Sequence, residues 1–256
     1  MDFQGTGAPA TRDGILAVLD KLNVKLPQLL AVASVETSGC GFLADRRPAI
    51  LFERHIFSRQ TGGKFDSQHS DISNPTPGGY SHGAAEYERL GKAVQLDRMA
   101  ALKSASWGIG QVMGFNFDKA GYGNVESMVQ KAMESEDEQL LAMANFLKAT
   151  GLDRPLAAQD WTSFARGYNG PDFSRNLYDA KLAAAFQRYQ FPPLPDITVR
   201  TAQMLLSYAG FHPGGVDGLT GKFTRAAAQD FREAHGMGTS DQIDEQLIDA
   251  LRAVGY

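Results

Sequence analysis

The sequence predicts a mainly α-helical protein with two domains. Apolar residues recur at helical spacing along most of the chain, and few stretches have the alternation of a strand. At 256 residues, the chain exceeds the usual ~100–200 residues of one domain. The proline-rich sequence FPPLPD at 191–196 suits neither helix nor strand. We therefore expect a larger domain over 1–190, a linker over 191–197 and a smaller domain over 198–256.

Composition narrows the function classes. The formal net charge is −4 with Lys and Arg scattered, so we expect no nucleic-acid or anionic-membrane partner. The one cysteine, Cys40, cannot form an intramolecular disulfide, which favours folding in a reducing cytoplasm. The first residues lack the basic start and apolar core of a secretory signal, and no run approaches a membrane span of ~18–20 apolar residues. We expect a monomer made in the cytoplasm, which needs another route to any external substrate.

Two helices follow a loose arm over residues 1–10. Thr11 is a plausible N-cap for the first helix, Arg12 to Leu22, whose apolar residues recur at helical spacing. Pro27 suits the first turn of the second helix, and Gly39 suits its end. The second helix thereby carries Glu36 to its C-terminal end.

The rest of the first domain alternates helical zones with loops. We expect a short buried run, strand or helix, at 50–52, and room for one small hairpin. The polar stretch 58–82, rich in Gly and Pro, is too long for a mere connection and is typical of a functional loop that walls a groove. Helical zones are expected at 83–102, at 125–148, from Leu156 onward, and from a cap at Asp172 or Ser174 to Tyr189.

The smaller domain shows three amphipathic helices, expected at Val199 to Ala209, Thr224 to His235 and about Asp244 to Ala253. Roughly sixty residues give a small independent core. A binding module is therefore more plausible here than an enzyme.

Glu36 is the strongest candidate for a catalytic group. One helical face places its carboxyl beside Leu29, Val32 and Ala33. Burial and the negative end of the helix dipole both disfavour the charged form, so both should raise its pKa. A protonated carboxyl is what a general acid needs to protonate a glycosidic oxygen. The alternative is an ordinary Glu on the exposed edge of a helix end.

Asp45 and Glu53 are candidates for a second carboxylate. Glycosidases commonly pair two carboxyls, about 5–5.5 Å apart for a covalent intermediate or about 6.5–9.5 Å apart when water attacks. Asp45 is flanked by Arg46 and Arg47, which would keep it ionised in catalysis or in a plain surface ion pair. Glu53 is either catalytic or a buried carboxylate paired with an arginine such as Arg54.

Two further motifs offer polar and aromatic groups for binding a sugar. In SASWGIGQVMG, Ser106 and Gln111 could hydrogen-bond a sugar ring, and Trp107 either stacks on it or fills the core. In ARGYNGPDF, Tyr168 and Asn169 offer a similar wall, although YNG is also an ordinary turn.

Three motifs together resemble the N-acetylmuramidase family of modular bacteriophage endolysins, within the lysozyme-like superfamily. They are VETSGCGFLADRRPAILFERHIF, SASWGIGQVMG and FARGYNGPDF, spanning essentially residues 15–190. The resemblance implies a lysozyme-like helical domain that cleaves peptidoglycan between N-acetylmuramic acid and N-acetylglucosamine without a metal or cofactor. It also implies that Glu36 is the acid and that SWGIGQVMG, Tyr168 and Asn169 line the sugar groove. Host lysis would follow release across the inner membrane.

The C-terminal region resembles a three-helix peptidoglycan-binding domain. Its VDGLTGKFTRAAAQDFREAHG carries Asp217, Gly218, Gly221, Thr224 and Phe231 at the positions of that family's pattern. The family's second DG-x-x-D stretch is reduced here to TSDQIDEQL. Asp217 and Gly218 either contribute to wall binding or simply make the turn that the helix packing needs.

Four other functions remain to be weighed. A zinc amidase needs clustered ligands, but there is no HExxH, and His69 with Asp71 lacks an evident third ligand. A cysteine peptidase would use Cys40, which follows a helix C-terminus rather than the activating N-terminus. A lytic transglycosylase cleaves the same bond with one acid and leaves an anhydro-sugar. A non-catalytic wall-binding or phage structural protein would not depend on Glu36.

Overall fold

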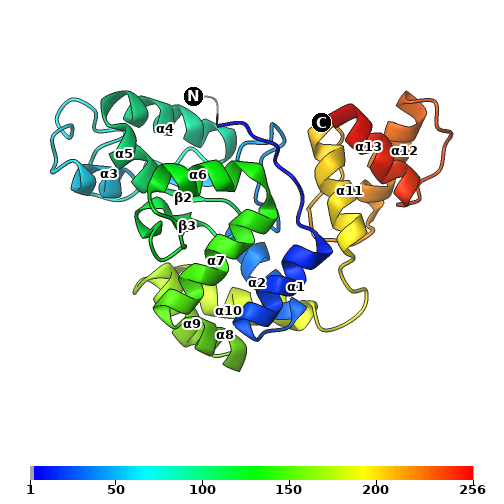
Figure 1. The fold of residues 1–256 in the computed structure, drawn as a ribbon, viewed down its shortest axis with the longest axis horizontal. Coiled ribbons are helices and arrows are strands. Elements are labelled where there is room, and N and C mark those ends of the chain that lie inside the picture. Colours follow the sequence, from blue (N-terminus) through cyan, green and yellow to red (C-terminus); the bar gives the residue numbers. More distant parts are fainter. Residues whose placement is uncertain (1–2, 256) are drawn as a thin grey trace.

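The computed structural model, which describes residues 3–255, is mainly α-helical with one small sheet, and this confirms the predicted fold class (Figure 1). The α-helices are α1 (Arg12–Leu22), α2 (Leu26–Thr37), α3 (Arg54–Gln60), α4 (Glu86–Leu96), α5 (Arg98–Lys103), α6 (Val125–Glu134), α7 (Glu136–Thr150), α8 (Asp153–Ala158), α9 (Trp161–Asn169), α10 (Tyr178–Arg188), α11 (Ile197–Tyr208), α12 (Lys222–Ala234) and α13 (Glu245–Gly255). None of the described helices is long and apolar enough to span a membrane.

The first two helices form as their sequences predict. The Thr11 hydroxyl accepts a hydrogen bond from the Gly14 amide at 3.0 Å and caps α1. In α2, the apolar face is buried, and the chain leaves the helix through Ser38 and Gly39, both with positive φ. This left-handed turn directly follows the last turn of α2, where Glu36 lies.

A three-stranded antiparallel sheet contains the expected hairpin. Strand β1 (Ile50–Phe52) pairs with β2 (Ala105–Trp107), which pairs with β3 (Val112–Met113). The turn between β2 and β3 contains Gly108, at φ +67°, where a Cβ would come within 2.4 Å of Gln139. Glycine is needed there because the turn lies directly against α7.

The structure departs from the sequence-based prediction near the end of the predicted larger domain, at α9 and α10. Helix α9 continues through Asn169, so Tyr168 and Asn169 belong to its last turn rather than to a loop. The prediction that Asp172 or Ser174 caps the last helix was wrong. A 3-10 helix, Phe173–Asn176, intervenes, and α10 starts after Leu177, whose side chain makes no capping hydrogen bond.

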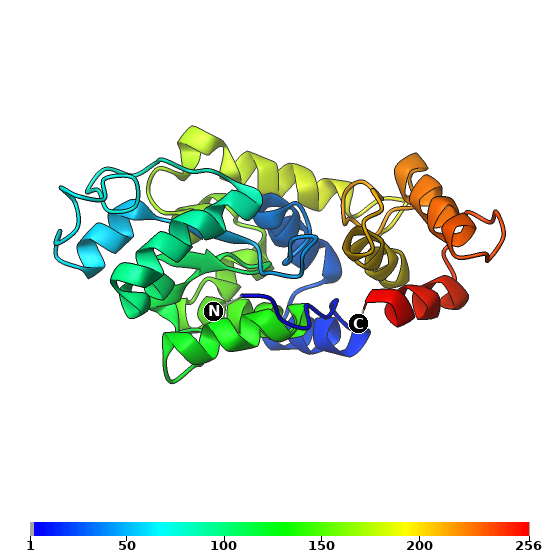
Figure 2. The same cartoon turned by 90° about the horizontal axis from the view of Figure 1, so that it is seen from above.

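Two hydrophobic cores lie on either side of the proline-rich segment. The larger core joins α1, α2, the sheet and α3 to α10, and the smaller joins α11, α12 and α13. Helices α11 to α13, called the smaller unit below, lie together beside the rest of the fold, called the larger unit. They lie next to the N-terminal arm and α1 (Figure 1; Figure 2). The predicted linker at 191–197 lies between these cores, although its last residue, Ile197, already begins α11, and the division into two domains stays a prediction.

Candidate active site

Glu36 lies in the last turn of α2, partly buried, with its carboxyl beside the end of α9. The side-chain amide of Asn169 donates a hydrogen bond to Glu36 Oε1 at 3.0 Å. Burial raises the pKa of Glu36 to about 7, and the Asn169 hydrogen bond opposes this rise without cancelling it. Near neutral pH, a large share of the Glu36 carboxyls is therefore protonated and can donate a proton.

A groove of about 330 Å³ opens at Glu36. The end of α2, strand β1 and the turn of the β-hairpin form part of its wall, and the loop before α4 completes it. The lining residues are Glu36, Thr37, Leu43, Ala49, Ile50, Leu51, Tyr80, His82, Gly83 and Gln111. The long polar stretch 58–82 thus contributes Tyr80 and His82 to a groove wall.

Glu53 lies directly after β1, at the start of α3. The Tyr80 hydroxyl donates to its carboxylate at 3.0 and 3.2 Å, and His55 Nδ1 lies 3.1 Å from Oε2. The pKa of Tyr178 is raised, first by burial and then by the negative charges of Glu36 and Glu53. One phenol therefore lies within the field of both carboxylates.

Asp45 lies in an exposed loop between α2 and β1. Its carboxylate is held by Arg47, with Nη2 at 2.6 Å and Nε at 2.8 Å from Oδ2. Its charge acts on the buried Tyr87, whose hydroxyl donates to Pro48 O, and Asp45 does not line the groove. Glu53 does not line the groove either, but it is bonded to the groove residue Tyr80 and acts together with Glu36 on Tyr178, whereas Asp45 is paired with Arg47.

The hairpin residues form a fixed polar wall. The Ser106 hydroxyl donates to Gln111 Oε1 at 2.7 Å, and Gln111 Nε2 donates to the carbonyls of Gly108 and Ala49. Gln111 reaches the groove, but its amide is already engaged in holding the turn. Trp107 is 2% exposed and donates to Leu102 O. It fills the core, which is the second of the two roles considered from the sequence, and does not face the groove.

Tyr168 and Asn169 fix the end of α9 against the hairpin and α2. The Tyr168 hydroxyl donates to Gly110 O, and its ring stacks on Phe164 with ring centroids 5.2 Å apart. Asn169 Nδ2 holds Glu36, while the buried Asn169 Oδ1 has no hydrogen-bond partner. An unpaired buried acceptor next to the acid could accept a hydrogen from water or from a sugar substituent.

Reasoning from the sequence missed the residues that hold the groove loop. Glu86, fully buried at the start of α4, accepts hydrogen bonds from the amides of Phe52, Ser81 and His82 and from Arg89. It therefore ties β1 to the loop that presents Tyr80. Neither Glu86 nor Tyr80 belongs to a motif, so the only signal was the length and polarity of the loop.

The candidate wall-binding residues make an internal network around Gln203 of α11. Gln203 Nε2 donates to Asp217 Oδ1 at 3.0 Å and to Thr224 Oγ1 at 3.1 Å, while Gln203 Oε1 accepts from the Gly218 amide. Gly218 has φ +74°. These contacts build the turn that the helix packing needs, and wall binding by these residues stays a prediction.

The structure gives little support to a cysteine peptidase or a zinc amidase. Burial, followed by the charge of Glu136, raises the pKa of Cys40 to about 12, so its thiolate is disfavoured. Among residues 3–255, no three His, Cys, Asp or Glu side chains are grouped so that they could hold a metal ion. Asp71 is paired with Lys92 at 2.9 Å.

The fold and the groove define a glycoside hydrolase of the lysozyme type. A family model for N-acetylmuramidase matches residues 25–190, and the chain therefore belongs to the N-acetylmuramidase family. The chain is also similar to the crystal structure of the Burkholderia AP3 phage endolysin. The two are 41% identical with a TM-score of 0.64, over 70% of each chain. No curated protein matches the chain.

Proposed function

We propose that this protein cleaves the β-1,4 bond between N-acetylmuramic acid and N-acetylglucosamine, with Glu36 as general acid. The observation that supports this most strongly is a carboxyl with a pKa of about 7 at the wall of an open groove. Glu36 donates its proton to the glycosidic oxygen as the bond breaks. The groove is open to solvent, as binding a long glycan strand requires.

For the second carboxylate we propose Glu53 rather than Asp45. Glu53 is held toward the groove loop by Tyr80 and shares an electrostatic environment with Glu36 around Tyr178. Asp45 is engaged by Arg47 on the surface. Glu53 then stabilises the oxocarbenium-like state or activates the attacking water.

The proposed biological role is host lysis by a phage endolysin, as in the AP3 relative. The three-helix unit α11 to α13 binds peptidoglycan and concentrates the enzyme on the wall. Glycan strands are the partner, the enzyme works as a monomer, and it acts on the cell wall after release across the inner membrane.

Hydrolysis of purified sacculi by Glu36→Gln, Glu53→Gln and Asp45→Asn tests the site. Glu36→Gln should lower the rate by about 10²- to 10⁴-fold, the usual contribution of a general acid. Glu53→Gln should also lose most activity, whereas Asp45→Asn should stay within a few fold of the wild type. A folded Glu36→Gln enzyme with wild-type activity would refute the proposal.

The products decide between hydrolysis and transglycosylation. Hydrolysis leaves reducing N-acetylmuramic acid ends, and a lytic transglycosylase leaves 1,6-anhydro ends. Mass spectrometry of digested sacculi should show the reducing form, and predominantly anhydro products would assign the alternative reaction.

A further inference from the structure

Helix α11 contacts the larger unit at the turn that ends α2, where Arg200 reaches Gly39. At the centre of this contact is a buried ion pair between Arg200 of α11 and Glu136 at the start of α7. Arg200 Nη1 lies 2.5 Å from Glu136 Oε2, and Nη2 lies 2.7 Å from Oε1. Arg200 is 6% exposed and Glu136 is fully buried. The smaller unit therefore inserts a fixed positive charge into the larger one.

The same pair holds the backbone that follows Glu36. Arg200 Nη2 also donates to the carbonyl of Gly39 at 2.5 Å. Glu136 Oε1 accepts from the Gly41 amide at 2.9 Å, and Oε2 accepts from the Ala10 amide at 3.0 Å. The ion pair thus makes direct contact on both sides of Cys40, within five residues of the proposed acid.

Apolar packing presses the smaller unit onto this turn. Met204 and Val216 of the smaller unit form a buried cluster with Phe42 of the larger one. A Cβ added at Gly39, which has φ +89°, would lie 2.4 Å from Val216 O. The turn is therefore covered by the smaller unit and has no room to shift toward it.

On its other side, the turn determines where the Glu36 carboxyl lies. The amide of Gly39 donates to Ala33 O at 3.1 Å, and the Thr37 hydroxyl donates to the same carbonyl at 3.1 Å. Glu36 lies in the chain between the acceptor Ala33 and these two donors, and its carboxyl accepts a hydrogen bond from Asn169. If the turn loosens, the last turn of α2 frays and the carboxyl gains water.

We propose that Arg200 is a positioning residue for catalysis: through Gly39 and Glu136 it fixes the last turn of α2 and thereby holds Glu36 in the groove. This rests on the proposed role of Glu36 as the acid. The smaller unit then serves the chemistry itself, in addition to any affinity for the wall.

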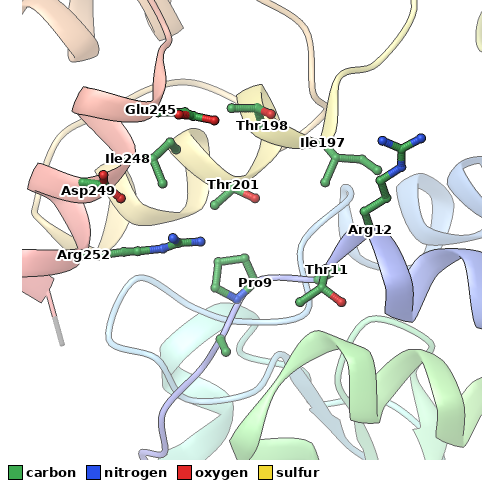
Figure 3. Close-up of a pocket in the computed structure, with 12 residues that line it drawn as sticks. Pro9, Thr11, Arg12, Ile197, Thr198, Thr201, Glu245, Ile248, Asp249 and Arg252 are labelled. Carbon is green, nitrogen blue, oxygen red and sulfur yellow. The ribbon is translucent and has the colours of Figure 1, made fainter.

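Two full-length variants test the proposal on a soluble glycan of alternating N-acetylglucosamine and N-acetylmuramic acid, which makes the assay independent of wall binding. Arg200→Lys keeps a charge opposite Glu136 but loses the planar fork that binds both Glu136 oxygens and, through Nη2, the Gly39 carbonyl. The double variant Arg200→Met with Glu136→Gln removes both charges together, so that neither remains buried alone. Arg252→Met is the matched control. Arg252 is an exposed arginine of α13 in a separate groove of about 770 Å³ between the two units (Figure 3).

Both Arg200 variants should lower kcat by about 10- to 100-fold, the range expected when a catalytic group moves by up to 1 Å. The alkaline limb of the pH profile should move to lower pH by about one unit, because water relieves the burial that raises the pKa of Glu36. KM should change less than twofold. Arg252→Met should match the wild type in kcat, in KM and in the position of the alkaline limb.

Cys40 reports the state of the turn independently of activity. It is the one cysteine of the chain and lies between Gly39 and Gly41. The rate of its reaction with a thiol reagent should rise in the Arg200 variants and not in Arg252→Met. A variant that labels faster yet keeps the wild-type kcat and pH limb would show that Arg200 only attaches the smaller unit.

If the double variant does not fold, Arg200→Lys decides: unchanged kcat and an unchanged pH limb overturn the proposal. Failure of the proposed function has a different signature. In that case Glu36→Gln stays active, whatever the Arg200 variants do.

Discussion

The environment of Glu36 sets two effects against each other, and burial is the larger. Asn169 stabilises the charged carboxylate, yet the pKa still rises to about 7. The fold therefore carries a carboxyl that is easier to ionise in the unfolded chain than in the native one. Such a group lowers stability at high pH while it supplies an acid for catalysis.

Glu36→Gln should accordingly stabilise the protein in a pH-dependent way. Stability from the protonated carboxyl is fully present below pH 4.5 and is lost as pH rises through about 7. The amide does not ionise, so its advantage in free energy of unfolding should be small at pH 4 and on the order of 1–3 kcal/mol at pH 8. Urea unfolding at both pH values measures it, and an equal difference at both would contradict the assigned pKa.

Asn169→Ala should move the pH profile in the opposite direction to the Arg200 variants. Loss of the donated hydrogen bond removes the effect that lowers the pKa of Glu36, so the alkaline limb should shift to higher pH. At the optimum, kcat should fall about tenfold, as loss of roughly 1.4 kcal/mol of hydrogen bonding gives. A limb that stays in place or moves lower would show that Asn169 does not control Glu36.

The sequence was sufficient to predict Glu36 as the acid, but not to predict its hydrogen bond with Asn169. The apolar neighbours of Glu36 and its place near a helix end predicted a raised pKa. Asn169 is 133 positions away, and the hydrogen bond depends on α9 extending about one turn into the expected loop. Local spacing carries no information on such a contact.

Helix α4 holds the loop of the groove through its first residue, Glu86. Glu86 collects three backbone amides and Arg89 inside the protein, and these include two residues of the loop that carries Tyr80. A single buried carboxylate thereby replaces regular secondary structure in fixing that loop.

Glu86→Gln should therefore cost far more than its conservative character suggests. The amide leaves Arg89 without its buried counter-charge and cannot accept from all four donors, so we expect a loss of about 3–5 kcal/mol in free energy of unfolding. Glu88→Gln, on the exposed face of the same helix, is the control and should stay within about 0.5 kcal/mol. Equal urea midpoints for the two variants would remove Glu86 from this role.

Elements with strong local signals were predicted well, and those held by distant contacts were not. Helix α1 begins and ends where its Thr11 cap and apolar spacing indicate. The stretch before α10 was mispredicted because a 3-10 turn, with no distinctive sequence signal, displaced the expected cap. The groove loop depends on Glu86, which the pattern of α4 presents as one more surface acid.

For the whole molecule, the sequence predicted two units but not how they meet. Arg200 lies in an amphipathic helix next to a spacer, where an arginine is expected to be solvated. Its partner Glu136 is 64 positions earlier, at the start of a helix where acidic residues are common at the surface. The two charges pair only because the two units dock.

Removing residues 196–256 should therefore do more than weaken wall binding. The truncated chain keeps Glu136 but loses Arg200, and it uncovers Phe42. Breaking such a pair typically costs about 3–5 kcal/mol, although solvent that enters the exposed site offsets part of this.

We expect the truncated chain to unfold at a lower urea concentration than the larger core of the full chain, to bind purified sacculi less, and to hydrolyse soluble glycan slowly. Adding Glu136→Gln to the truncated chain should recover part of the stability, because no unpaired carboxylate remains. Wild-type stability together with wild-type hydrolysis in the truncated chain would mean that the two units are independent. Unchanged sacculus binding would refute the wall-binding assignment alone.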